Sequence, residues 1–168
     1  EKEIGKVEKI FSSQNSITKL FLKNSATEQA LRNQNLDEYK ILYFATHGLL
    51  PGELKCQAEP GLVLTPPIKS VIRENDGLLE ASEIATMRIN ADMVVLSACN
   101  TAGSENQFGG DSLSGLAEAF FHAGARSLVV SHWQVPSKAT ATLMTSMFED
   151  LGPNLSKGPT LSLRNAQK

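Results

Sequence analysis

A short apolar run that leads to a cysteine constrains this chain more than any other feature. Residues 93–96 (Met-Val-Val-Leu) follow Asp92, and the polar stretch that begins after them contains Cys99. An apolar run of this length, bounded by polar residues, is typical of a buried strand. A Gly-rich loop at 103–110 and an amphipathic helix at 112–123 come next. Strand, loop and helix in this order predict an α/β unit with Cys99 at the carboxyl end of its strand, where catalytic groups gather in open α/β sheets.

A second β-prone run ends close to a histidine. Residues 39–45 are mostly apolar and aromatic, and they run directly into Thr46-His47-Gly48, where we expect a loop. If the two strands are parallel neighbours, the imidazole of His47 comes close to the thiol of Cys99. An imidazole activates a thiol by taking its proton or by stabilising the thiolate. We expect the backbone N–H groups of Gly48 and Cys99 to bind the oxyanion that forms when the thiol attacks an amide.

Each of these residues also has a structural interpretation. Cysteines are among the most buried residues, so a cysteine at a strand end often belongs to the core. Cys56 lies in a proline-rich, irregular segment and is interpreted as an incidental thiol. His122 lies near a helix end, where a histidine interacts favourably with the helix dipole. His132 ends a further strand, but bulky Trp133 follows it instead of a glycine, so we interpret His132 as a pocket residue.

Cofactor and metal chemistry find little support in the sequence. No His and Cys pair stands at the short spacing of a metal site, so we expect no metal and no cofactor. The loop at 103–110 lacks the Gly-Lys-Ser/Thr ending of a P-loop, which argues against nucleotide binding.

Composition limits the class of protein. The 168 residues are 41% hydrophobic and 20% charged, which suits a single globular domain over 1–168. A net charge of −2 without a Lys/Arg cluster argues against binding of nucleic acid or membranes, and no apolar run reaches the roughly 18 residues of a membrane span. Two cysteines suggest reduced thiols. The chain starts without Met and has no signal peptide. We therefore expect a protein that is either cytoplasmic or has lost a targeting segment, and we expect this chain to be the C-terminal piece of a longer protein.

Hydrophobic periodicity predicts the remaining elements. We expect helices at 2–12, 82–87, 140–151 and 161–167, and strands at 17–22, 62–64 and 126–132. Ser25 is expected to cap a further helix, with Glu28 completing a capping box, and Gly124 is expected to end the helix at 112–123. Strands that alternate with helices predict an α/β fold with a mostly parallel sheet, covered by helices on both faces. The strand order stays open.

At this point an ordered set of motifs resembles the CHAT domains, which are caspase-like cysteine peptidases related to separase and caspases. The resemblance covers about 25–167. Its motifs are residues 44–48 (Phe-Ala-Thr-His-Gly), 76–79 (Asp-Gly-Leu-Leu), 82–84, 94–101 (Val-Val-Leu-Ser-Ala-Cys-Asn-Thr), 115–120, 123–127, 131–135 and 163–167.

The resemblance implies a caspase-like three-layer α/β/α sandwich, a His47–Cys99 dyad and peptide cleavage through an acyl-enzyme. It also implies tetratricopeptide repeats or another regulatory region elsewhere in a longer protein. Two departures concern positions outside the dyad. Gly109-Gly110-Asp111 stands where the family often has Gly-Glu-Gly, and Ser137 stands where the family often has an acidic residue.

Two functions remain as hypotheses. The first is a cysteine endopeptidase that cleaves protein substrates, with Ser131, His132, Trp133 and Asp111 in its substrate pocket. The second is a catalytically silent caspase-like scaffold that uses the same cleft to bind a peptide or a partner protein. An intact set of Cys99, His47 and Gly48 favours the endopeptidase.

Overall fold

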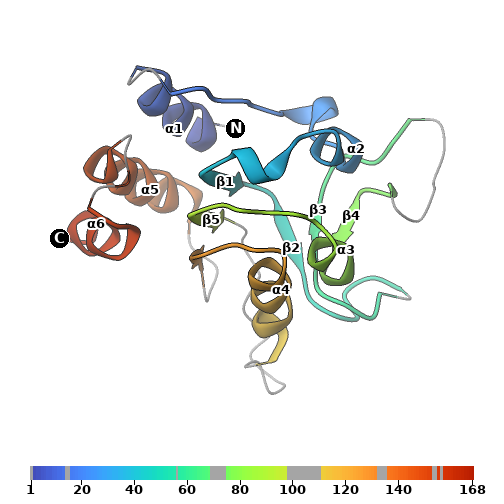
Figure 1. Cartoon of the computed structure of the whole chain (residues 1–168). Coiled ribbons are helices and arrows are strands. Elements are labelled where there is room, and N and C mark those ends of the chain that lie inside the picture. Colours follow the sequence, from blue (N-terminus) through green and yellow to red (C-terminus); the bar gives the residue numbers. More distant parts are fainter. Residues whose placement is uncertain are drawn as a thin grey trace. The chain divides into compact units, whose positions relative to one another are not determined.

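The protein is described here from a computed structural model (Figure 1). The described residues are 2–13, 16–55, 57–68, 75–97, 111–131, 136–152, 155 and 157–168. The chain divides into two compact units, one made of Glu1–Leu20 with Val135–Lys168 and the other of Phe21–Gln134. Each unit is treated by itself, and the single domain expected over residues 1–168 stays a prediction.

A parallel sheet forms the centre of the larger unit. Its strand order is β1-β5-β6, with β1 at Ile41–Phe44, β5 at Met93–Leu96 and β6 at Leu128–Val130. Every residue of β5 is buried, because this strand has a neighbour on both sides, whereas β1 and β6 are mostly half-buried. The expectation that the strand before Cys99 and the strand before His47 are parallel neighbours is confirmed.

An antiparallel sheet forms the second part of this unit. Its order is β2-β3-β4, with β2 at His47–Leu49, β3 at Gly61–Val63 and β4 at Leu78–Glu80. The middle residue of each strand is buried, as expected for strands with one face toward a core. The sequence predicted a loop around His47 and Gly48. That prediction is wrong, because the chain turns after β1 and starts β2 at His47.

Short helices and one long helix complete the larger unit. They are η1 (Lys23–Ser25), α2 (Glu28–Arg32), η2 (Leu36–Glu38), α3 (Ala81–Ala85) and α4 (Asp111–His122). Helix α4 packs on the parallel sheet through fully buried Phe120, whose ring centroid lies 5.6 Å from that of Phe44 in β1. Gly124 ends α4 as predicted, with a positive φ of 108° that glycine adopts readily.

Three local predictions are wrong. Residues 17–22 form no strand in the structure. Helix α2 is capped by Thr27, whose hydroxyl accepts a 3.1 Å hydrogen bond from the Ala30 N–H, so Ser25 is not its cap. Ser82, which the sequence favours as the cap of the helix predicted at 82–87, lies inside α3, because this helix begins at Ala81. A Glu83 carboxylate oxygen instead accepts a 2.9 Å bond from the Glu80 N–H. Thr and Glu side chains compete with serine for such backbone groups, and tertiary packing selects among them.

Three helices form the smaller unit, namely α1 (Lys2–Ser13), α5 (Ser137–Leu151) and α6 (Pro159–Ala166). Helices α1 and α5 meet through Phe11 and Phe148, whose rings lie edge to face with centroids 5.4 Å apart. All three helices match predicted ones, with bounds shifted by a few residues. Within the described residues, no helix combines the length and the apolar character that a membrane crossing requires. The predicted α/β class with a parallel sheet is confirmed.

Candidate active site

The three parallel strands end at one edge of their sheet. Phe44, Leu96 and Val130 lie opposite one another at the last register position. The chain leaves β5 at Ser97, whose backbone N–H donates a 2.9 Å hydrogen bond to the carbonyl oxygen of Phe44. Ser131, which is half-buried, leaves β6 at the same edge. Segments that follow these strands therefore start side by side, as expected at the ligand-binding edge of an α/β sheet.

His47 lies close to this edge at the start of β2. It follows Phe44 by three positions, and its side chain is exposed. Val63 of β3 is its register partner, and the Thr46 hydroxyl donates a hydrogen bond to the Val63 carbonyl. The strand pairing fixes the backbone of His47, while the imidazole remains accessible to a substrate.

Gly48 lies on the opposite face of the same sheet. It is buried and pairs with Leu62, which is fully buried, so this face points into the core. Side chains alternate between the faces of a strand, and this alternation leaves His47 on the accessible face. In an antiparallel pair the N–H groups also alternate between the partner strand and the free edge. An edge strand such as β2 can thus offer a backbone donor next to His47.

The turn before β4 supports these strands. Gly77 has a φ of 95°, and an added Cβ would lie 2.9 Å from Pro66 Cα, so a side chain does not fit there. The Leu64 N–H donates a 2.8 Å bond to the Gly77 carbonyl, and an Asp76 carboxylate oxygen accepts a 2.8 Å bond from the Leu78 N–H. Asp76 therefore acts as a turn residue, which explains the Asp-Gly-Leu-Leu motif.

Glu28 is the residue that sequence reasoning missed. Its side chain is fully buried, and Oε1 accepts a 2.6 Å hydrogen bond from the Gly77 N–H. Burial raises the pKa of the Glu28 carboxyl above its ordinary value, and the bond from Gly77 partly opposes this effect. We expected Glu28 to complete a capping box with Ser25, but it lies in the first turn of α2 and binds Gly77 in the distant turn before β4. A Thr-Glu pair before an apolar position is a helix-start signal, and it does not reveal burial.

Several predicted site residues fall outside the described part of the chain. Cys99, His132 and Trp133 are among them, and so the His47–Cys99 dyad stays a prediction. Cys56, which we interpreted as an incidental thiol, is also outside the described part. Asp111 is the first residue of α4, and its side chain is outside the described structure. The described part of the predicted site consists of His47, Gly48 and Ser131.

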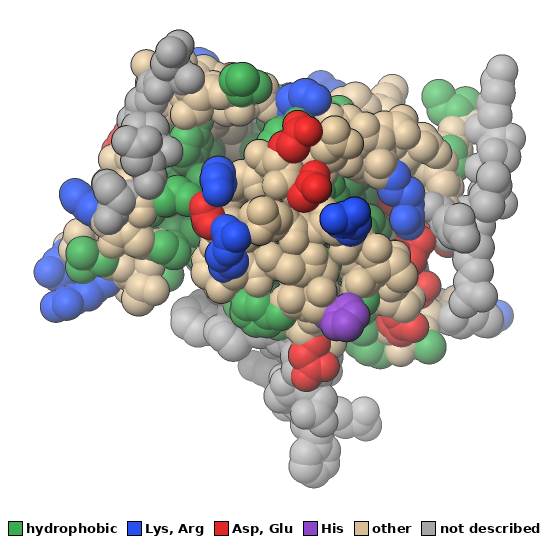
Figure 2. Space-filling view, viewed as in Figure 1, with side chains coloured by type: hydrophobic (Ala, Val, Ile, Leu, Met, Phe, Trp, Pro, Cys, Tyr) green, Lys and Arg blue, Asp and Glu red, His purple; other side chains and the backbone are tan. Residues whose placement is uncertain are grey.

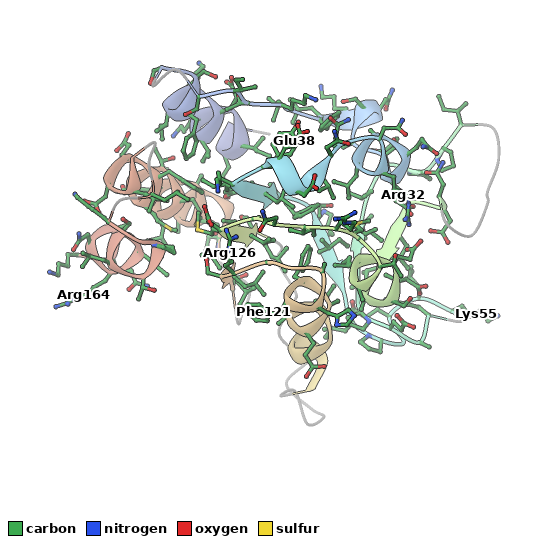
Figure 3. The ribbon with its side chains drawn as sticks, viewed as in Figure 1. Arg32, Glu38, Lys55, Phe121, Arg126 and Arg164 are labelled. Carbon is green, nitrogen blue, oxygen red and sulfur yellow. The ribbon has the colours of Figure 1, made fainter. Side chains whose placement is uncertain are left out.

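Charged side chains gather at the opposite edge of the parallel sheet. Asp92, which precedes β5, forms ion pairs with Arg126 and, at 3.5 Å, with Lys40. Arg126 Nη2 also donates a 2.7 Å bond to Asn90 Oδ1 (Figure 3). On the face drawn in Figure 2, acidic and basic side chains of the described residues lie intermixed. The charged amino edge and the small polar residues of the carboxyl edge give the sheet two chemically different ends.

Two shallow surface grooves have linings that do not include His47. One, of about 360 Å³, runs between α3 and α4 and is lined by Ala81, Ala85, Gly115, Glu118, Ala119 and His122. The other, of about 550 Å³, belongs to the smaller unit and is lined by residues of α5 and α6 together with Pro136. His122 is exposed at the end of α4, as its structural interpretation anticipated. Within the described residues, no three His, Cys, Asp or Glu side chains are arranged to hold a metal ion.

Comparison with known proteins identifies the family. The CHAT domain family model matches residues 1–168, the full length of the sequence. No curated protein matches the chain. The family match agrees with the α/β fold and the parallel sheet. The chain belongs to the CHAT domain family, whose members are caspase-like domains related to cysteine peptidases.

Proposed function

We propose that this domain is a cysteine endopeptidase in which Cys99 is the nucleophile and His47 transfers protons. The observation that carries the proposal is the pairing of β1 with β5. The Ser97 N–H bonds to the Phe44 carbonyl, so the chain segments that carry the two proposed catalytic residues leave the sheet side by side. Parallel neighbours of this kind are the usual way for an α/β sheet to bring residues distant in sequence to one site.

Chain length supports the pairing. Cys99 follows Ser97 by two positions, and two residues span at most about 7 Å. His47 follows Phe44 by three positions and lies on β2. Neighbouring strands are about 4.8 Å apart, so a thiol and an imidazole that follow neighbouring strands can come within reach of each other.

The chemistry follows from these groups. His47 takes the proton of the Cys99 thiol, and the thiolate attacks the scissile carbonyl carbon. The carbonyl oxygen becomes an oxyanion, for which the N–H groups of Gly48 and Cys99 are the proposed donors. When the C–N bond breaks, His47 gives its proton to the leaving amine and a thioester remains. Water then attacks the thioester, with His47 as base, and releases the acid product and the thiol.

The proposed substrate lies in extended form beside residues 131–135, the segment that follows β6. This strand is an outer member of the described order β1-β5-β6, and Ser131 follows it at the carboxyl edge. An added peptide strand would gain backbone hydrogen bonds there. His132, Trp133 and Asp111 are the other proposed pocket residues. Trp133 would form one wall of the pocket unless it belongs to the core. A bound peptide or covalent inhibitor that lies elsewhere would contradict this part of the proposal. We further propose that a regulatory region, such as tetratricopeptide repeats, controls access to the site.

Thiol alkylation tests the endopeptidase proposal without a known substrate. A free cysteine has a pKa of about 8.5, and a neighbouring imidazole lowers it. We expect Cys99 to react with iodoacetamide well below that pH, at a rate that falls in His47→Ala. Cys56 should react at the rate of an ordinary thiol and serves as the internal control. Peptide mass spectrometry across a pH series measures both rates. If Cys99 stays inert until the protein unfolds, both with and without its regulator, the result would favour the catalytically silent scaffold.

A further inference from the structure

One buried carboxylate has no part in the proposed chemistry. Glu28 Oε1 accepts the 2.6 Å bond from the Gly77 N–H, whereas Oε2 is buried without a hydrogen-bond partner in the described structure. Arg32 Nη2 lies 3.8 Å from Oε2, beyond hydrogen-bond distance. A buried carboxylate with an unsatisfied oxygen destabilises a fold. The unsatisfied carboxylate of Glu28 therefore calls for a role other than stability.

The Glu28 carboxylate connects directly to the strands that carry His47. Gly77, which it binds, immediately precedes β4, and the Gly77 carbonyl accepts the 2.8 Å bond from the Leu64 N–H. Leu78 of β4 lies opposite Val63 of β3, and Val63 lies opposite His47 of β2. The backbone of His47 is thus linked to Glu28 through two consecutive strand pairings.

The segment before Glu28 strengthens this link. The Thr65 N–H donates a 2.8 Å bond to the Ala26 carbonyl, and the Thr65 hydroxyl donates a 2.7 Å bond to the Lys23 carbonyl. Residues 23–28 consequently hold both the exit of β3 and the entrance of β4. Figure 1 shows α2 next to these two strands. A change at Glu28 would therefore affect the hydrogen bonds that hold β3 and β4, and through these strands the whole β2-β3-β4 sheet.

Charges from three elements surround the Glu28 carboxyl. Arg32 of the same helix attracts it, while Glu83 of α3 and Asp76 of the turn before β4 repel it. Arg32 Nη2 also forms a 2.7 Å ion pair with Glu83 Oε1, which draws the guanidinium away from Glu28 (Figure 3). Burial is the largest cause that raises the pKa of the Glu28 carboxyl, and the two repulsions add to it. The carboxylate therefore takes up a proton more readily than an exposed one.

We propose that Glu28 is a positioning residue for His47, which holds the imidazole in place through Gly77 and the β4–β3–β2 strand pairings and loosens this hold when its carboxyl is protonated. The role rests on the proposed function only in taking His47 as the proton-transfer group. Protonation converts a charge-assisted acceptor into a neutral one, and charge-assisted hydrogen bonds are roughly twice as strong as neutral ones. The strand positions that are linked to Gly77 by backbone hydrogen bonds are then held less firmly.

A titration of the wild-type protein by NMR tests the proposal without any substitution. The Gly77 amide signal reports protonation of the carboxylate that it binds. We expect the Leu64 and Val63 amides and the His47 ring signals to shift with the same midpoint as Gly77. Steps in the Gly77, Leu64 and Val63 signals that come from the His47 ring itself are identified by their loss in His47→Gln. A flat response of the His47 signals through the Gly77 midpoint overturns the proposal.

Substitutions then separate positioning from simple support. Glu28→Gln keeps the size of the side chain and an acceptor for the Gly77 N–H, so the fold should remain. The titration step that shares the Gly77 midpoint, the Gly77-linked step, should vanish from every signal. The matched control is Glu38→Gln, a carboxylate exposed in the same unit, which should leave all steps unchanged. A Gly77-linked step in the His47 ring signals that survives Glu28→Gln contradicts the proposal. Alkylation of Cys99 is read separately, so an unreactive Cys99 would defeat the peptidase proposal without altering the NMR result.

Discussion

The backbone N–H of Ser97 donates a 2.9 Å hydrogen bond to the carbonyl oxygen of Phe44, at the edge where β5 and β1 end. This bond holds the start of the segment that leads to Cys99 against the strand that leads to His47. Both segments leave the same edge of the parallel sheet, and preorganised positions of this kind favour the proposed catalysis.

Replacement of His47 by Ala should separate function from stability. The side chain is exposed, and exposed substitutions usually change the free energy of unfolding by less than about 0.5 kcal/mol. Loss of a general base typically lowers rates by about 100-fold or more. We expect an unchanged urea midpoint together with loss of peptide cleavage and of the fast Cys99 alkylation. His122→Ala, at the exposed end of α4, is the matched control and should retain both. Normal cleavage by His47→Ala would rule out the dyad.

Replacement of Phe120 by Ala should weaken the support of the sheet edge at which the proposed site lies. Phe120 is fully buried against Phe44, and truncation of a buried Phe costs about 3–5 kcal/mol. Phe121, the next residue, is 50% exposed and provides the control, because Phe121→Ala removes a side chain of the same size from the surface. Chemical denaturation should show a large loss of unfolding free energy for Phe120→Ala and a small one for Phe121→Ala. Similar losses for the two would contradict the packing of α4.

Replacement of Gly124 by Ala should be strongly destabilising. Gly124 has a φ of 108°, which costs an L-residue about 1–3 kcal/mol, and an added Cβ would lie 2.0 Å from the Ile89 carbonyl oxygen. Gly5 is the contrasting site, because it lies in α1 with nothing within 4 Å of an added Cβ. Gly5→Ala should stabilise the protein by about 0.5–1 kcal/mol through helix propensity. Thermal unfolding measures both changes, and equal effects would disprove the conformational argument.

Replacement of Glu28 by Gln should change how stability depends on pH. The pKa of Glu28 is raised in the folded protein above its ordinary value of 4.5, so the folded state binds the proton more tightly than the unfolded state. The contribution of this group is therefore fully present at acidic pH and is lost as pH rises through the folded pKa. The unfolding free energy of Glu28→Gln minus that of wild type should increase over this window, and Glu38→Gln should show no such trend. A difference that stays constant with pH would show that burial leaves this carboxyl unperturbed.

Much of the fold follows from local sequence patterns. The apolar run at 93–96 predicted β5, and the helical spacing of Val7 and Phe11 predicted α1. Gly124 marked the end of α4 because a positive φ at a helix end favours glycine. The family and the α/β class were also within reach of the sequence, since the motifs occur in order along the chain.

Only the tertiary structure decided where His47 and Glu28 lie. Residues 46–49 look like a loop after an apolar strand, but their pairing with β3 makes them a strand, and such long-range hydrogen bonds leave no local pattern in three residues. Glu28 has the sequence signature of a capping residue, yet its partner Gly77 lies 49 positions away. The sequence by itself determined which segments are strands and helices wherever burial repeats with a regular period. Pairing between distant segments determined which of their side chains meet, because register and buried polar contacts depend on the packed chain as a whole.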